Sequence, residues 1–173
     1  MRRLVALTVI TASLLILGFA LHVADIVAQQ RSLKEQLVGT WKLVSVDNLR
    51  DDGSKVEPFG PNPTGIVIYT RDGHFALLNG RSDLPKFASN RRDKGTPEEN
   101  KAVVEGSIAY FGTYWVNEAD KAITAKIEGS TFPNFVGTDQ KRIITSLTED
   151  ELKFTNPAGS SGGTLQLVWK RAK

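Results

Sequence analysis

Two tyrosines and one arginine carry the polar groups that an enclosed binding site would use. Tyr110 and Tyr114 share one face of any strand that contains both, because side chains alternate along a strand. An inward phenol can hydrogen-bond a ligand carbonyl while its ring packs on the ligand, or it can simply belong to the core. Arg142 lies two positions before Ile144; facing inward, it would bind a carboxylate through two hydrogen bonds, and facing outward it is a surface charge.

Other kinds of site chemistry lack the residues they need. The sequence has no Cys, which excludes disulfides, thiolate zinc sites, iron–sulfur clusters and cysteine nucleophiles. Beyond residue 28 the single histidine is His74, next to a turn, so a multi-histidine metal site is impossible there. Residues 159–163 match the G-x-S-x-G pattern of hydrolases, but they form a loop between two predicted strands. We therefore predict no metal, no cofactor and no catalytic residue.

Residues 1–28 are predicted to be a secretory signal peptide. Arg2 and Arg3 form a positive start, and residues 4–21 contain no charged side chain. We expect cleavage after Ala28, although an apolar run of this length would also serve as an uncleaved membrane anchor. Either outcome places the remaining domain, residues 29–173, in the periplasm or outside the cell.

Composition points to one folded domain and argues against nucleic acid as a partner. At 173 residues, with 40% hydrophobic and 24% charged residues, the chain resembles a soluble single-domain protein. Its net charge is only +3. The basic residues between 86 and 94 have little aromatic interleaving, so they are interpreted as a solvated loop.

Short strands dominate the sequence after residue 39. Alternating segments rich in β-branched and aromatic residues predict eight strands near 40–48, 65–70, 74–79, 109–117, 122–128, 140–147, 151–155 and 164–171. A helical turn is expected over 31–38. Thr96-Pro97-Glu98-Glu99 combines a capping box with proline at the first helical position, which predicts a helix from there to about Gly106.

The dipeptide Asp72-Gly73 predicts a two-residue hairpin turn between the second and third strands. In that register Thr70 lies opposite Phe75. One face then carries Ile66, Ile68, Phe75 and Leu77, and the other carries Val67, Tyr69, Ala76 and Leu78. Because both faces are apolar, we expect the Phe75 face to line an interior and the other to be covered by the predicted helix or by a second subunit.

These elements predict an all-β fold, an eight-stranded antiparallel up-and-down barrel with one short helix between its third and fourth strands. Closing the barrel removes the exposed sheet edges. An eight-stranded barrel has an interior just wide enough for side chains or one small ligand.

Several segments resemble the bacterial lipocalin-like domain family over about residues 36–172. Gly39-Thr40-Trp41 after a short helix resembles the G-x-W motif of lipocalins, and Arg171 is similar to the arginine that packs over that tryptophan. Residues 110–116, 130–142 and 167–171 strengthen the resemblance. It implies a calycin-type barrel with a ligand cavity.

The predicted function is an exported protein that binds a small hydrophobic or amphipathic ligand in the barrel. The candidate contact residues are Trp41, Ile68, Phe75, Leu77, Tyr110, Tyr114, Asn134 and Arg142. Trp41 has an alternative role as a plug at the barrel floor. One alternative function is an isomerase or cyclase acting on a lipid- or polyketide-like substrate, with an acid or base among Tyr110, Tyr114, Arg142 and His74. Another is a filled barrel whose outer face binds protein, including a homodimer partner.

Overall fold

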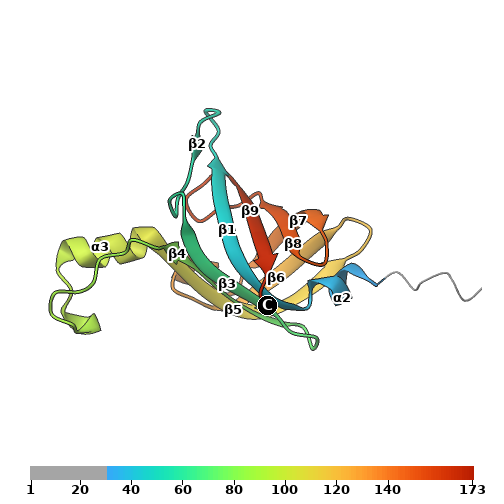
Figure 1. The fold of residues 1–173 in the computed structure, drawn as a ribbon, viewed down its shortest axis with the longest axis horizontal. Coiled ribbons are helices and arrows are strands. Elements are labelled where there is room, and N and C mark those ends of the chain that lie inside the picture. Colours follow the sequence, from blue (N-terminus) through green and yellow to red (C-terminus); the bar gives the residue numbers. More distant parts are fainter. Residues whose placement is uncertain (1–30) are drawn as a thin grey trace, which may run out of the picture. The chain divides into compact units, whose positions relative to one another are not determined.

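Eight strands close into an antiparallel barrel in the computed structural model, which describes residues 31–173 (Figure 1). Each strand pairs with its neighbour in sequence, apart from the short β2, and β1 pairs with β9 to seal the cylinder. The predicted all-β up-and-down barrel is therefore confirmed. The predicted signal peptide, residues 1–28, lies outside the described residues.

The strands are close to those predicted. Their bounds are β1 Gly39–Leu49, β2 Lys55–Val56, β3 Pro63–Tyr69, β4 His74–Arg81, β5 Ser107–Asn117, β6 Ala122–Ser130, β7 Asp139–Leu147, β8 Glu151–Asn156 and β9 Thr164–Arg171. The helical elements are α2 Leu33–Leu37 and α3 Pro97–Gly106, and the 3-10 turns are η1 Arg92–Lys94 and η2 Pro133–Phe135. The short β2 was not predicted; it pairs with the last two residues of β1, Asn48 and Leu49. None of the helices in residues 31–173 is both long enough and apolar enough to cross a bilayer.

One end of the barrel is closed by a floor made of Leu37, Trp41 and Arg171. The indole Nε1 of the fully buried Trp41 donates to the Leu37 carbonyl at 2.8 Å, and the Arg171 guanidinium lies 4.0 Å from the Trp41 ring centre. Arg171 also donates to the carbonyls of Gln36 and Val38, which fixes the end of α2 against the barrel. The predicted packing of an arginine over this tryptophan is confirmed.

Above the floor the interior is filled by the protein's own side chains. The rings of Tyr114, Tyr69, Phe75 and Tyr110, in that order, form a chain of contacts with centroid distances of 5.0–6.2 Å from each ring to the next. Tyr110 in turn contacts Phe135 near the opposite end. This aromatic packing leaves the open end of the barrel, rather than its centre, as the place for a ligand.

The register of the β3–β4 hairpin differs from the prediction. Tyr69 lies opposite Phe75, and Thr70 pairs with His74, so the loop has three residues and ends on Gly73 with φ of 94°. The Thr70 hydroxyl accepts from the His74 amide and donates to Asp72, which adds side-chain bonds within this longer turn.

One extra loop residue exchanges the two faces of β3 relative to β4. Val67, Tyr69, Phe75 and Leu77 face the interior. The prediction that Ile66 and Ile68 share the interior face with Phe75 is wrong, since both point outward and Ile68 is 38% exposed.

Helix α3 starts at the predicted residue but does not cover the outer face of the sheet. Thr96 and Glu99 form the expected capping box. The helix leads straight into β5 with no residue between them, so it projects away from the barrel instead of folding back (Figure 1). The outward-facing Leu78, Phe111 and Trp115 are therefore about half exposed, and the expectation that the helix covers this side is wrong.

Glu99 gives the start of α3 a measurable pH dependence. Its carboxylate accepts from the amides of Ala88 and Thr96, and these hydrogen bonds hold its pKa below the usual 4.5. Because the folded pKa is the lower one, the contribution is present above about pH 4.5 and is lost as the pH falls through the folded pKa. We expect the ¹⁵N–¹H resonances of Ala88 and Thr96 to titrate together in that acidic range. In Glu99→Gln this transition should disappear; a transition that persists in the variant contradicts the assignment.

Candidate ligand-binding site at the open end of the barrel

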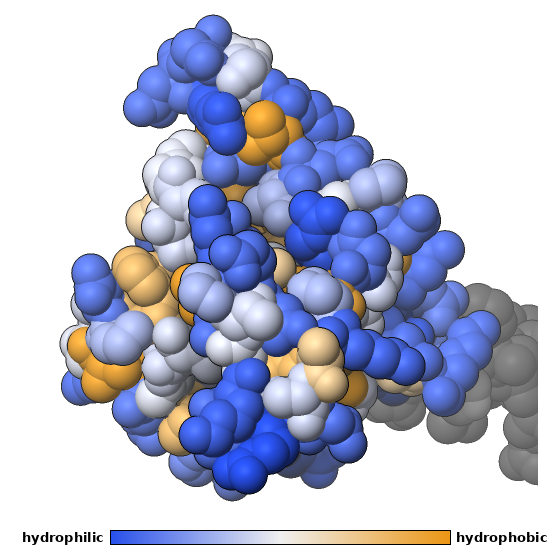
Figure 2. Space-filling view, turned by 90° about the vertical axis from the view of Figure 1, so that its left-hand side faces the viewer, coloured by the Kyte–Doolittle hydropathy of each residue, from blue (hydrophilic) through white to orange (hydrophobic). Residues whose placement is uncertain are grey.

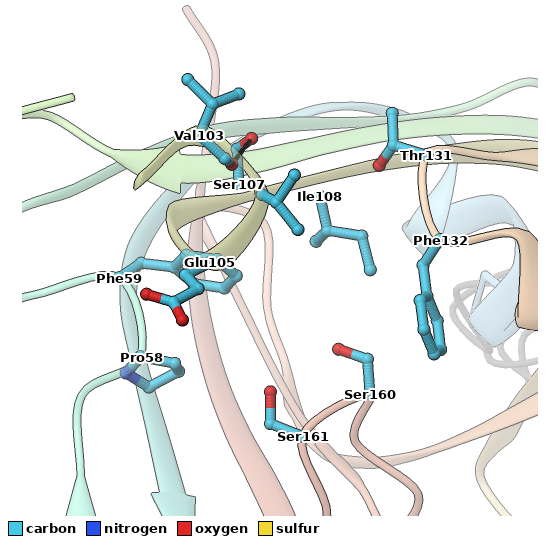
Figure 3. A pocket seen from close by; sticks show the side chains of 11 residues that line it. Pro58, Phe59, Val103, Glu105, Ser107, Ile108, Thr131, Phe132, Ser160 and Ser161 are labelled. Atoms are coloured by element: carbon cyan, nitrogen blue, oxygen red, sulfur yellow. Dashed lines mark hydrogen bonds between the residues drawn. The ribbon is translucent and has the colours of Figure 1, made fainter. Parts of the chain in front are cut away.

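A pocket opens at the end of the barrel opposite the floor. This mouth pocket has a volume of about 360 Å³. It lies between α3, the start of β5 and three loops, and its lining residues are Pro58, Phe59, Val103, Val104, Glu105, Ser107, Ile108, Thr131, Phe132, Ser160 and Ser161. Figure 3 shows Phe59 and Phe132 on opposite sides of the space, with Ile108 above and the two serine hydroxyls below. The pocket thus combines apolar walls with several hydroxyl groups and one carboxylate, that of Glu105.

The surface on the α3 side of the protein is mostly hydrophilic, and its apolar residues lie in small separate groups (Figure 2). Three apolar side chains of the mouth pocket, those of Phe59, Ile108 and Phe132, are partly buried and pack against the core cluster, whereas Val104 on α3 is 78% exposed. The partly buried apolar groups at this end therefore lie in the recess rather than on this outer face.

A smaller inner pocket adjoins the mouth pocket on the side of the barrel interior. It has a volume of about 30 Å³ and shares Phe59, Ile108 and Ser160 with the mouth pocket. Its other lining residues are Asn79, Tyr110, Phe135, Arg142, Asn156, Leu165 and Leu167. By volume this space holds about two water-sized groups, so it suits the end of a ligand and not a whole one.

Arg142 and Tyr110 meet in this inner pocket. Arg142 is 4% exposed, and its guanidinium donates to the Tyr110 hydroxyl at 3.1 Å and to its neighbour's carbonyl, that of Lys141, at 3.0 Å. The two side chains come from β7 and β5, and the barrel's curvature brings them together. The alternation of β7 places Arg142 on the same inward face as Ile144, which resolves the two orientations open at the sequence level.

The tyrosines deeper in the barrel are held in their neutral form. Burial raises the pKa of Tyr69, and the positive charge of Arg142 opposes that rise. Burial, together with the nearby negative charge of Asp72, also raises the pKa of Tyr114, whose hydroxyl donates to the Thr70 carbonyl at 2.7 Å. Neither phenol is arranged to lose its proton near neutral pH, so both contribute packing and hydrogen bonding.

The structure divides the predicted contact residues into five groups. Tyr110 and Arg142 line the inner pocket. Phe75, Leu77 and Tyr114 face the filled interior, and Trp41 forms the floor. Ile68 lies on the outer face. Asn134 is exposed on η2 and lines neither pocket, and His74 is on an exposed strand end beside Asp72. That a residue lines a pocket does not test whether it contacts a ligand, so each role in binding stays a prediction.

Sequence reasoning missed most of the pocket walls. Phe59 and Ser160 lie in loops with no hydrophobic period, so nothing in the sequence ties them to the barrel. Asn79 and Asn156 lie near the ends of β4 and β8, where alternation places them inward. Their inward-facing positions could have indicated a polar site at this end of the barrel, because a buried amide needs a hydrogen-bond partner.

Comparison with known families decides what this barrel is. The model of the lipocalin-like domain matches residues 38–172. The chain belongs to the lipocalin-like domain family. Trp41 and Arg171 of this lipocalin-like barrel fall inside the matched range, as do all the residues that line its two pockets. No curated protein matches the chain.

The chain is similar to several solved structures at low sequence identity. The crystal structure of a lipocalin-like protein from Bacteroides uniformis is 12% identical and covers 79% of this chain and 99% of its own, with a TM-score of 0.44. An NMR structure of a protein from the same organism is 16% identical and covers 82% of this chain and 94% of its own, with a TM-score of 0.43. A de novo designed fluorescence-activating β-barrel is 12% identical and covers 83% of this chain and 100% of its own, also with a TM-score of 0.43. The family assignment rests on the sequence match.

Proposed function

We propose that this lipocalin-like protein is exported and binds a small amphipathic ligand at the open end of its barrel. The observation that carries the proposal is the mouth pocket, whose volume of about 360 Å³ lies within the roughly 300–1,000 Å³ of small-molecule sites. The pocket adjoins the smaller inner pocket with its buried polar groups. An apolar recess with a polar end suits a ligand that has both characters.

The lining supplies affinity and orientation by different means. Phe59, Ile108 and Phe132 offer apolar surface whose burial against a ligand is worth roughly 25 cal/mol per Å². Ser160 and Tyr110 offer hydroxyl groups at the narrow end. Small-molecule sites usually have apolar walls and a small number of polar groups, and those polar groups fix the orientation of the ligand.

Export is the part of the proposal that rests on the first 28 residues. The positive start and the uncharged stretch that follows it have the order of a secretory signal. Expression of the full chain in a bacterium, followed by fractionation and intact-mass measurement, tests this. We expect periplasmic protein shortened by 28 residues; a full-length membrane-bound product instead supports the anchor, and a full-length cytoplasmic product contradicts export.

Binding is tested with a neutral apolar fluorophore, N-phenyl-1-naphthylamine, which brightens when it leaves water. We expect saturable binding to the wild-type protein. Phe59→Asp places a charge in the apolar wall of both pockets, and should weaken binding by about tenfold or more because that charge is desolvated by the probe.

Phe111→Asp is the matched control, since it makes the same exchange on the outer face of β5, where Phe111 is 54% exposed. Its affinity for the fluorophore should equal that of the wild type. Equal weakening by both variants, or no saturable binding to the wild type, contradicts a ligand site at the barrel mouth.

A further inference from the structure

Arg142 is a buried charge without a counterion. Among residues 31–173 it is the one charged side chain in the buried set, which otherwise holds asparagine and glutamine amides and contains no aspartate or glutamate. No ion pair joins it to any carboxylate in that part of the chain. Buried charges in proteins are normally paired, because removing a charge from water is costly. The partner of Arg142 is therefore missing from the described fold.

The hydrogen bonds around Arg142 leave donors without acceptors. The guanidinium uses two of its N–H groups on the Tyr110 hydroxyl and the Lys141 carbonyl, and the remaining N–H groups have no acceptor among the described residues. Because the Tyr110 oxygen accepts from Arg142, its own proton is directed elsewhere, and no described acceptor receives it. Two side chains thus present hydrogen-bond donors and a positive charge to the same small space.

The size of that space restricts what can enter it. The inner pocket, about 30 Å³ in volume, accommodates about two water-sized groups, which is the size of the two oxygens of a carboxylate. A guanidinium binds a carboxylate through two parallel hydrogen bonds. Asn79 also lines this pocket, and its buried side-chain oxygen has no partner among the described residues; as an acceptor it needs a donor such as a water molecule, so it is not a contact for the carboxylate.

We propose that the inner pocket binds the carboxylate of a monocarboxylic acid through Arg142 and Tyr110, while the apolar tail of the acid lies in the mouth pocket. This inference rests on the proposed function and names the chemical class and the orientation of its ligand. The orientation follows from the shared walls: Phe59 and Ile108 line both pockets, so a single molecule spans them with its charged end innermost.

The experiment compares decanoate with its neutral methyl ester as competitors for N-phenyl-1-naphthylamine. The wild-type protein should bind decanoate about tenfold or more tightly than methyl decanoate. Arg142→Met keeps the length of the side chain but removes the charge, and should abolish this preference. Tyr110→Phe removes one donor and should weaken decanoate binding by about fivefold while leaving the ester unchanged.

Arg81→Met is the matched control, because Arg81 is an exposed arginine at the same end of the barrel, paired with Asp83. It should leave both affinities unchanged. A second readout is thermal unfolding without ligand: Arg142→Met should unfold at a temperature equal to or above that of the wild type, since it removes an unpaired buried charge.

The outcomes separate this inference from the proposed function. Equal affinity for decanoate and its ester, or a preference for decanoate that survives Arg142→Met, overturns the carboxylate site while binding of the fluorophore still supports the mouth pocket. Failure of the fluorophore itself to bind overturns both. A loss of preference in Arg142→Met with a folded, stable variant supports the assignment.

Discussion

Replacing Trp41 with alanine is expected to lower the free energy of unfolding by about 3–5 kcal/mol. The ring is fully buried, its indole nitrogen donates to the Leu37 carbonyl at 2.8 Å, and the guanidinium of Arg171 packs on its face. Truncation therefore leaves a cavity and also removes the surface that aligns Arg171 with α2. Since natural domains are stable by only about 5–15 kcal/mol, this is a large fraction of the total. Urea unfolding followed by far-ultraviolet circular dichroism measures the change.

The control for this experiment is the same substitution on the outside of the barrel. Trp115 is 48% exposed on β5, so Trp115→Ala should cost about 1 kcal/mol or less. A cost for Trp41→Ala no greater than that for Trp115→Ala would show that the floor does not hold the barrel closed. If Trp41→Ala does not fold, Trp41→Phe keeps part of the ring volume and should lose more stability than Trp115→Ala but less than the loss of about 3–5 kcal/mol expected for Trp41→Ala.

The barrel was predictable because its information is local and repeated. In β6, for example, Ile123, Ala125 and Ile127 alternate with polar residues, and such alternation fixes both the strand and its buried face. The helix start at Pro97 was equally local, since the capping box of Thr96 and Glu99 lies within four residues. Where one short segment contains the whole signal, sequence and structure agree.

The β3–β4 register was not predictable in the same way. Asp72-Gly73 fits a two-residue turn, but Thr70 closes a three-residue loop with its hydroxyl, and this loop buries Tyr69 rather than Ile68. Both faces of β3 are apolar, so hydrophobic patterning offers no choice between the two registers. The choice is made by packing: Tyr69 on β3 contacts Phe75 on β4 and Tyr114 on β5, and those contacts join three neighbouring strands.

The candidate site shows the same division between local and distant information. Arg142 and Tyr110 were named from strand patterning, because an inward polar residue in an apolar strand stands out. Their meeting at 3.1 Å depends on the curvature of three consecutive strands, which the sequence does not specify locally. Phe59 and Ser160 reach the pocket from loops, so only the folded barrel brings them to it.

The second large effect is expected from Gly112→Ala. Gly112 lies on the inner side of β5 at an irregularity in the β5–β6 pairing, and an added Cβ would stand 1.9 Å from the Lys126 carbonyl oxygen and 3.0 Å from the Glu128 amide nitrogen. Both are backbone atoms of the paired strand β6, so the steric clash with the added methyl group can be removed only if β5 and β6 move apart. We expect a loss of about 3 kcal/mol in the free energy of unfolding, measured by urea denaturation.

Gly80→Ala isolates the steric cause, because both substitutions add one methyl group to a buried strand glycine. At Gly80 the new Cβ would meet its nearest neighbours, the Gly106 carbonyl oxygen and the Ser107 Cβ, at 3.5 Å, an ordinary contact distance. Its stability should therefore stay within about 0.5 kcal/mol of the wild type or rise slightly, since alanine restricts the unfolded chain. Equal losses in both variants would mean that chain flexibility, and not the close approach of β5 to β6, requires glycine at position 112. A loss confined to Gly112→Ala would establish that the barrel closes here at a spacing which no side chain fits.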